Sequence, residues 1–153
     1  MKIQGDGGHA SVIKELITAV GDPGDGFAVI AVGKNSDRKF EAERLSKNMT
    51  FAPALIHPTA FVSHSATLGE GTVVMAGAVI QANAKIGKHV IVNTCASVDH
   101  DCVIEDFAHI APGVHLCGGV QVGEGALIGV GSCAVPGSKV SPWTLVNAGS
   151  IIK

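Results

Sequence analysis

One histidine of the chain sits between two carboxylates, in the run Val98-Asp99-His100-Asp101-Cys102. A histidine changes its charge near neutral pH, and a neighbouring carboxylate can fix its tautomer and favour the imidazolium that forms when it takes a proton. His100 is therefore a candidate general base. The same segment also fits a histidine on a solvated turn, and these residues alone leave both interpretations open.

A glycine-rich segment near the N-terminus, Gly5-Asp6-Gly7-Gly8-His9, leads directly into a stretch with helical apolar spacing. Glycines before a helix N-terminus let backbone N–H groups approach a phosphate. The segment fits such a loop, and it also fits a plain glycine turn that caps the helix.

The element that must position His100 is a repeat of six residues. From Ile56 to Ile152 every sixth residue is Ile, Leu or Val, except Ala134, and the residue four places later is always small or β-branched. Neither the strand period of about 2 nor the helix period of about 3.6 explains such a pattern. Three hexads make one triangular coil, so the sequence predicts a parallel β-helix of about five stacked coils.

Two further histidines, His109 and His115, are one hexad apart. They should occupy equivalent positions on successive faces of the triangle and should not share a metal within one chain. Surface or interface histidines are the alternative for both. The remaining turn histidines, His57, His64 and His89, are assigned no role.

Residues 1–55 follow different rules. Apolar spacing predicts a helix over Ser11–Val20, and a continuous apolar run predicts a buried parallel strand over Phe27–Val32. The charged stretch Asn35–Lys47 predicts a helix with a weak apolar face, and Phe51–Leu55 fits another strand. This alternation predicts a small α/β unit over 1–55 ahead of a β-helix over 56–153.

Composition narrows the class of protein. The net charge is −2 and no basic cluster stands out, so we expect no nucleic-acid partner. No apolar run reaches the roughly 18 residues of a membrane span, and the first residues lack a signal-peptide core, so we expect a cytoplasmic protein without a membrane partner. The four cysteines form no C-x-x-C pair, and we expect reduced, mostly packed thiols.

The chain resembles one family in three places. These are Gly5-x-Gly-Gly-His9, Ile56-His57-Pro58, and the stretch Asn93–Gly119 with its pattern Val98-Asp-His-Asp-Cys…Phe107-x-His109-x-x-x-Gly113. The family is that of the bacterial sugar acetyltransferases, which includes sialic-acid O-acetyltransferase and UDP-4-amino-sugar N-acetyltransferase. The third pattern is far more specific than the hexads.

The resemblance implies a left-handed parallel β-helix preceded by a small Rossmann-like unit, and a homotrimer with active sites between adjacent β-helices. It implies direct transfer of acetyl from acetyl-CoA to an amino or hydroxyl group of a sugar or nucleotide-sugar. His100 would take the acceptor's proton, and Asp101 would orient and polarise His100. Acetyl-CoA is the implied co-substrate, and no metal is expected.

The resemblance also implies two sets of binding residues. The set that would contact acetyl-CoA consists of His109, Gly118, Val130 and Ala148. The set on the acceptor side consists of Asn93, Gly5, Gly7, Gly8 and His9, with the glycines and His9 holding the nucleotide or sugar end.

The chain departs from the family at both ends. Only Met1 to Gln4 precede Gly5, and the Gly21–Gly26 loop replaces a longer segment that helps to hold the nucleotide in family members. The chain ends at Ile151-Ile152-Lys153, without the usual Gly-x-Pro-Ala-Lys-like tail. The resemblance therefore does not fix whether the acceptor is a nucleotide-sugar or how it is held, and the affinity for CoA could be reduced.

Three other functions remain as alternatives. A γ-class carbonic anhydrase needs three histidines converging on zinc across a trimer interface, and His100, His109 and His115 lack its usual spacing. The others are a non-catalytic or degenerate scaffold, and an acetyltransferase for a non-sugar small acceptor. The residues do not distinguish N- from O-acetylation.

Overall fold

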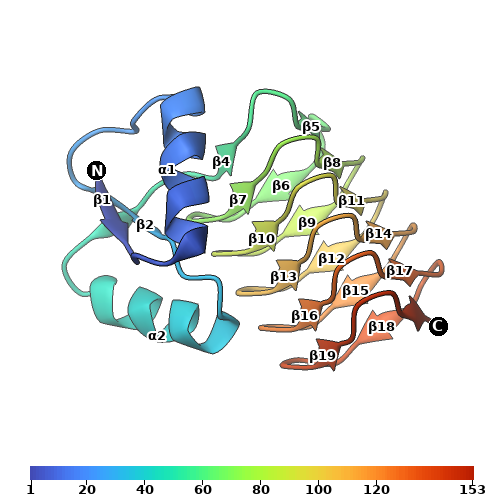
Figure 1. Ribbon diagram of the computed structural model, residues 1–153. Coiled ribbons are helices and arrows are strands. Elements are labelled where there is room, and N and C mark those ends of the chain that lie inside the picture. Colours follow the sequence, from blue (N-terminus) through green and yellow to red (C-terminus); the bar gives the residue numbers. More distant parts are fainter.

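A computed structural model describes all residues, 1–153, as a small α/β unit followed by a coil of short parallel strands (Figure 1). Residue Ile91 pairs with His109 and Ser97 with His115, so one coil takes 18 residues. The parallel strands and the hexapeptide repeat fit a left-handed β-helix, and the β-helix predicted from the hexads is confirmed.

The coils stack three parallel sheets, which we call faces 1, 2 and 3. Face 1 has six strands: β4 (Leu55–Ile56), β7 (Val73–Val74), β10 (Ile91–Val92), β13 (His109–Ile110), β16 (Leu127–Ile128) and β19 (Leu145–Val146). Face 2 has six strands: β5 (Phe61–Val62), β8 (Val79–Ile80), β11 (Ser97–Val98), β14 (His115–Leu116), β17 (Cys133–Ala134) and β20 (Ile151–Ile152). Face 3 has five strands: β6 (Thr67–Leu68), β9 (Lys85–Ile86), β12 (Val103–Ile104), β15 (Gln121–Val122) and β18 (Lys139–Val140).

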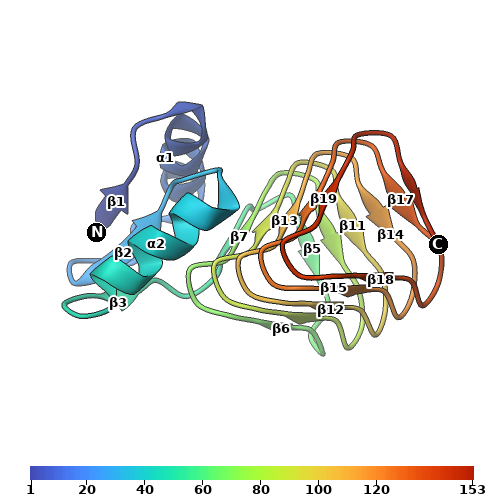
Figure 2. The same ribbon diagram turned by 90° about the horizontal axis from the view of Figure 1, so that it is seen from below.

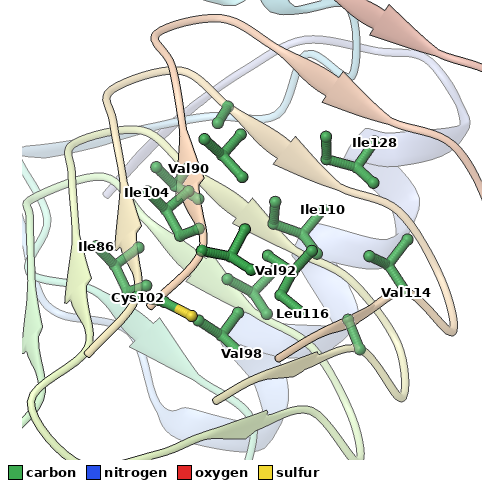
Figure 3. Packing of buried hydrophobic residues seen from close by; sticks show 14 of the residues in the cluster. Ile86, Val90, Val92, Val98, Cys102, Ile104, Ile110, Val114, Leu116 and Ile128 are labelled. Atoms are coloured by element: carbon green, nitrogen blue, oxygen red, sulfur yellow. The ribbon is translucent and has the colours of Figure 1, made fainter. Parts of the chain in front are cut away.

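The interior of the β-helix is filled by the aliphatic residue of each hexad and by the small residue four places later. Figure 3 shows Ile104, Ile110 and Leu116 pointing inward from the three faces of one coil, with Val92 and Val98 from the coil before. These side chains belong to one apolar cluster of 22 buried residues. Because these inward side chains are buried against those of adjacent coils, each coil is stabilised only by its contacts with its neighbours.

The turns between faces share one backbone conformation. At most corners one residue has a φ between about 53° and 75°, and at six corners this residue is not glycine. Asp101 is one of these six, with φ 59°. Asp and Asn tolerate this left-handed region better than most residues, so the turn geometry holds the Asp101 backbone where the coil requires it.

The N-terminal unit has a three-stranded parallel sheet in the order β1-β2-β3, with strands β1 (Lys2–Gln4), β2 (Phe27–Ile30) and β3 (Thr50–Phe51). Helix α1 (Gly8–Val20) follows β1, and helix α2 (Asn35–Leu45) follows β2. The two predicted helices and the strand at Phe27 are present, and α1 begins earlier than expected, within the glycine segment. Neither helix has the length and apolar run needed to cross a membrane.

The α/β unit lies beside the coils, against face 1 (Figures 1 and 2). The buried side of α1 packs with the outward side chains of Leu55, Val73 and Ile91, which occupy one column of face 1. The next residue in that column is His109. In this column the apolar contact of α1 therefore stops where a polar, titratable side chain begins.

Candidate active site

His100 and Asp101 form a pair at the corner between β11 and β12. The Nδ1 atom of His100 lies 2.8 Å from Oδ2 of Asp101. Asn83, one coil earlier, donates from Nδ2 to Oδ1 of Asp101 at 3.1 Å. With both oxygens of Asp101 engaged, His100 donates from Nδ1, and its Nε2 has no partner in the chain. The pair is more than half exposed, so a substrate can reach Nε2.

The charges around His100 favour its protonated form. The hydrogen bond with Asp101, and then the negative charge of Asp99, raise the pKa of His100 above the ordinary histidine value. The hydrogen bonds from His100 and Asn83 lower the pKa of Asp101. A carboxylate that stays ionised beside the ring stabilises the imidazolium that forms when Nε2 takes a proton.

Gly118 lies next to the His100 ring, one coil further along the same corner. A Cβ atom at Gly118 would lie 2.6 Å from both Cε1 and Nε2 of His100, so only glycine leaves room for the ring. The Gly118 N–H donates to no acceptor in the chain. An unpaired backbone donor and an unpaired imidazole nitrogen therefore share one patch of surface.

His109 lies on the outer side of β13 and is kept neutral. Asn93 donates from Nδ2 to Nε2 of His109 at 3.1 Å, which leaves the proton on Nδ1. Thr94 N–H in turn donates to Oδ1 of Asn93 at 2.8 Å and fixes the orientation of the amide. Burial, then the positive charge of Arg38 and the nearby His9, lower the pKa of His109 to about 3.

The glycine segment Gly5–His9 forms one wall of an open hollow of about 390 Å³, and Ala31, Val32 and Gly33 form the other. Gly5 has a φ of 130°, and a Cβ there would lie 2.5 Å from the Ala31 carbonyl oxygen, so the close approach of the two walls requires glycine. Helix α1 begins at Gly8, and its N-cap residue Gly7 offers no side-chain acceptor. Such an uncapped helix start can receive an anion.

His9 contributes a second neutral histidine to this region. Its Nε2 atom is buried without a hydrogen-bond partner. Burial, then the charge of Arg38, lower the pKa of His9 to about 4. Because His9 is among the causes of the lowered pKa of His109, the glycine segment and His109 belong to one neighbourhood.

The structure places the remaining candidates on the coils but does not gather all of them. Val130 and Ala148 lie one above the other at the corner between faces 1 and 2, on successive coils after Thr94 and Pro112. The acceptor-side candidates lie against face 1, whereas His100, Asp101 and Gly118 lie at the corner between faces 2 and 3. No hydrogen bond connects the two groups within one chain.

The other reactive residues lie apart from both groups. His115 is on face 2, where it contacts Ser97 Oγ at 2.8 Å, so His109 and His115 do occupy different faces. No group of three or more His, Cys, Asp or Glu residues in the chain could hold a metal ion.

The expectation of mostly packed cysteines is wrong. All four are free thiols, but three are exposed, at Cys95, Cys117 and Cys133. The reason is their place in the hexad: these three occupy turn or outward positions, and only Cys102 occupies the small inward position.

Three polar residues that the sequence analysis left aside are buried beside the candidate site: Asn35, Arg38 and His89. Arg38 is 1% exposed, although it lies in the charged stretch that the sequence analysis regarded as a weakly amphipathic helix. The spacing of Asn35 and Arg38, three residues apart on one helix face, is the signal that could have indicated a shared contact.

Comparisons with known proteins find similarity in sequence and in fold. A family model described as bacterial transferase hexapeptide (six repeats) matches residues 54–100. The UDP-N-acetylbacillosamine N-acetyltransferase of Bacillus subtilis is 41% identical over a region that covers 48% of this chain and 50% of the relative. The chain thus spans about half the length of this curated relative.

Several solved structures match almost the whole chain, and two of them serve as examples. One is the acetyltransferase domain of PglB from Neisseria gonorrhoeae in complex with acetyl coenzyme A, with 36% identity, 97% of this chain and 87% of that chain covered, and a TM-score of 0.89. The other is a variant of the GDP-perosamine N-acetyltransferase of Caulobacter crescentus in complex with CoA and GDP-perosamine. It has 34% identity, 99% and 87% coverage, and a TM-score of 0.94.

Proposed function

The chain belongs to the bacterial sugar acetyltransferases of the hexapeptide-repeat type, and we propose that it transfers acetyl from acetyl-CoA to an amino group of a nucleotide-linked sugar. The observation that carries the proposal is the His100–Asp101 pair, with a free Nε2 beside the unpaired N–H of Gly118. Two relatives are named as N-acetyltransferases, which favours an amino over a hydroxyl acceptor.

In the proposed reaction His100 is the general base. The acceptor nitrogen attacks the thioester carbonyl carbon while Nε2 of His100 takes a proton from that nitrogen. The C–S bond then breaks, and the CoA thiolate leaves and takes the proton from the imidazolium. The products are the N-acetyl sugar and CoA thiol, and no acyl-enzyme is needed.

The N–H of Gly118 is the proposed donor to the carbonyl oxygen as negative charge develops on it. A backbone donor that is already in place costs no reorganisation during the reaction. Acetyl-CoA would extend from this point past Val130 and Ala148 of an adjacent copy, and His109 of that copy would hydrogen-bond near the acetyl group through its Nδ1 proton.

The α/β unit is the proposed acceptor-binding part, and residues 56–153 are the proposed catalytic part. The hollow between Gly5–His9 and Ala31–Gly33 would receive the phosphates, because it combines glycine backbone with the start of α1. This use of the unit corresponds to a shortened Rossmann-like domain. His109, which is hydrogen-bonded to Asn93, is electrostatically coupled to His9 of the hollow, so these two residues would contact the sugar.

The proposed site forms between two copies in a homotrimer. Within one chain His100 lies at the corner between faces 2 and 3, and the hollow lies against face 1. A second β-helix packed alongside, with its corner turned toward face 1 of the first, would bring His100 of one copy to the hollow of the other.

The experiment that tests the function follows release of CoA thiol with a panel of UDP- and GDP-linked amino sugars, sialic acid and simple amino acids. His64→Ala is the matched control for His100→Ala, because His64 occupies the same turn position two coils earlier, is exposed and has no hydrogen-bond partner. We expect turnover on an amino sugar, about 10²–10⁴-fold lower in His100→Ala and unchanged in His64→Ala.

Two other outcomes would support a different function. Turnover confined to an amino acid would support an acetyltransferase for a non-sugar acceptor. A folded protein that acetylates no acceptor, or a His100→Ala variant as active as wild type, would refute the proposed function or its base and favour a non-catalytic scaffold.

A further inference from the structure

Arg38 is the most enclosed charged residue of the protein. It projects from α2 and is 1% exposed, and it forms no ion pair with a carboxylate. Burial lowers the pKa of its guanidinium to about 9. An arginine without a counter-ion is costly to bury unless hydrogen bonds occupy all its donors.

The donors of Arg38 are all occupied, and most of the acceptors are backbone carbonyls. On the side of the α/β unit, Nη1 donates to the carbonyls of Val32 and Gly33, each at 3.0 Å. On the side of the β-helix, Nε donates to the His89 carbonyl at 2.8 Å, and Nη2 donates to the Phe107 carbonyl at 2.7 Å.

The carbonyls that accept from Arg38 connect one wall of the hollow to the β-helix segment just before His109. Val32 and Gly33 line the hollow itself. Phe107 and Ala108 immediately precede His109 on the chain, and the Ala108 carbonyl lies 3.4 Å from Nη2. One planar group with a fixed arrangement of donors therefore joins the wall at Val32–Gly33 to the segment that leads into His109.

Asn35 completes the arrangement from the same helix. Its Oδ1 accepts from Nη2 of Arg38 at 2.9 Å, and its Nδ2 donates to the Gly125 carbonyl at 2.9 Å. The guanidinium is thus held in orientation by a second buried side chain that also reaches the coil after the one carrying His109.

We propose that Arg38 is a positioning residue for acetyl transfer, and that its guanidinium sets the distance between the acceptor hollow and His109. This inference rests on the function proposed above. Arg38 touches neither the hollow nor the reacting atoms, so it acts through the loop at Val32–Gly33 and through the Phe107–Ala108 backbone. Lysine cannot replace it, because an ammonium group has three donors on a single atom.

The same two units are also joined by a second charged contact, which provides the control. Lys39 Nζ lies 2.7 Å from Oε1 of Glu124, and both side chains are about one-third exposed. Lys39→Met removes this ion pair and leaves the Val32 and Gly33 carbonyls bonded to Arg38. Arg44, which pairs with Glu41 on the exposed side of α2, gives a matched Arg44→Lys substitution.

The test measures kcat, KM for the acceptor and KM for acetyl-CoA in full-length Arg38→Lys, Arg44→Lys and Lys39→Met. We expect Arg38→Lys to lower kcat/KM for the acceptor about 10²-fold, mainly through KM, with KM for acetyl-CoA nearly unchanged. Both controls should stay close to wild type. An unchanged acceptor KM in Arg38→Lys, or an equal loss in Lys39→Met, would overturn the proposal.

Hydrogen exchange without substrate separates this proposal from the proposed function. Suppose that wild type acetylates nothing. Faster exchange over residues 31–34 and 107–109 in Arg38→Lys, but not in Lys39→Met, would still support the positioning role, and unchanged exchange would overturn it.

A second variant covers the case in which Arg38→Lys does not fold. Asn35→Ala keeps the guanidinium and removes one of its hydrogen-bond acceptors. A smaller rise in acceptor KM is then expected, and an unchanged KM overturns the proposal.

Discussion

At the scale of single residues, the proposed chemistry depends on two atoms, Nε2 of His100 and the amide nitrogen of Gly118. Asp101 and Asn83 fix the ring of His100 and leave Nε2 open. Because Gly118 has no side chain, there is space for that ring. The backbone N–H of Gly118 donates to no acceptor in the chain. The proposed base and the proposed oxyanion donor are thus positioned by neighbours on adjacent coils.

The space beside His100 can be tested with Gly118→Ala. The added Cβ would lie 2.6 Å from the ring and must displace it. We expect kcat to fall by about 10–10²-fold, because a displacement near 1 Å is enough for such a loss. The turn itself accepts alanine, since Ala82 occupies the same position two coils earlier. An active Gly118→Ala variant with a normal melting temperature would contradict the assigned place of the ring.

The role of Asp101 can be tested with Asp101→Asn through the pH profile. Asp101 raises the pKa of His100 in wild type, so its loss should lower that pKa. The acidic limb of kcat/KM reports protonation of the base in the free enzyme. We expect this limb to move to lower pH, with turnover reduced by about 10²-fold at neutral pH. A limb that stays in place would show that His100 is not the titrating base.

At the scale of elements, the hexads and the coils correspond closely, and the buried polar residues do not follow from any local pattern. The inward positions could be predicted because each hexad repeats the same burial, as Ile104 and Ile110 illustrate. The first helix could be predicted from apolar spacing, the strand at Phe27 from its continuous apolar run, and the second helix from its charged stretch. Burial of Arg38 and His89 could not, because it arises only when α2 packs against coils that follow it by 50 residues or more.

Only part of the candidate site could be predicted from the spacing of residues in the sequence. The proximity of His100 and Asp101 follows from their place in the chain, whereas the roles of Gly118, Val130 and Ala148 came from the family resemblance alone. The contact between Gly118 and His100 depends on an 18-residue coil, and the close approach of the ring depends on side-chain geometry that spacing does not specify.

The contact between α2 and the coils should make the protein sensitive to acid. His89 is 4% exposed and packs on Phe51 and Phe107, with ring centroids 4.5 and 5.2 Å away. Burial is the main cause that lowers its pKa from 6.5 to about 4. The unfolded chain therefore binds more protons than the folded one between these values, so the stabilisation is complete above pH 6.5 and is lost as pH falls toward 4.

Denaturant unfolding across this pH window measures the effect. We expect the free energy of unfolding to fall with decreasing pH in wild type, and to fall less steeply in His89→Asn, since asparagine tolerates the φ of 53° at this turn. His64→Asn, at an exposed turn, is the control. Equal slopes in wild type and His89→Asn would show that another group is responsible.

At the scale of the whole molecule, each chain carries two separate parts of the proposed active site, which we call half-sites. One contains His100 at the corner between faces 2 and 3, and the other contains the hollow and His109 at face 1. Helix α1 packs on the first three residues of one face 1 column, and His109 is the next residue of that column. His100 faces away from the α/β unit, at the opposite corner of the β-helix. Within a single chain, therefore, the proposed base has no hollow beside it, and the proposed acceptor hollow has no base.

The measurement that tests this account most directly is complementation between two inactive variants. His100→Ala and His109→Ala each spoil one half-site, so each should be impaired alone. In trimers formed from equal amounts of both, about one quarter of the interfaces would combine an intact His100 with an intact His109 if the copies mix at random. We expect turnover to rise to about that fraction of wild type. Mixed trimers that form but recover no turnover would contradict a site shared between copies around His100.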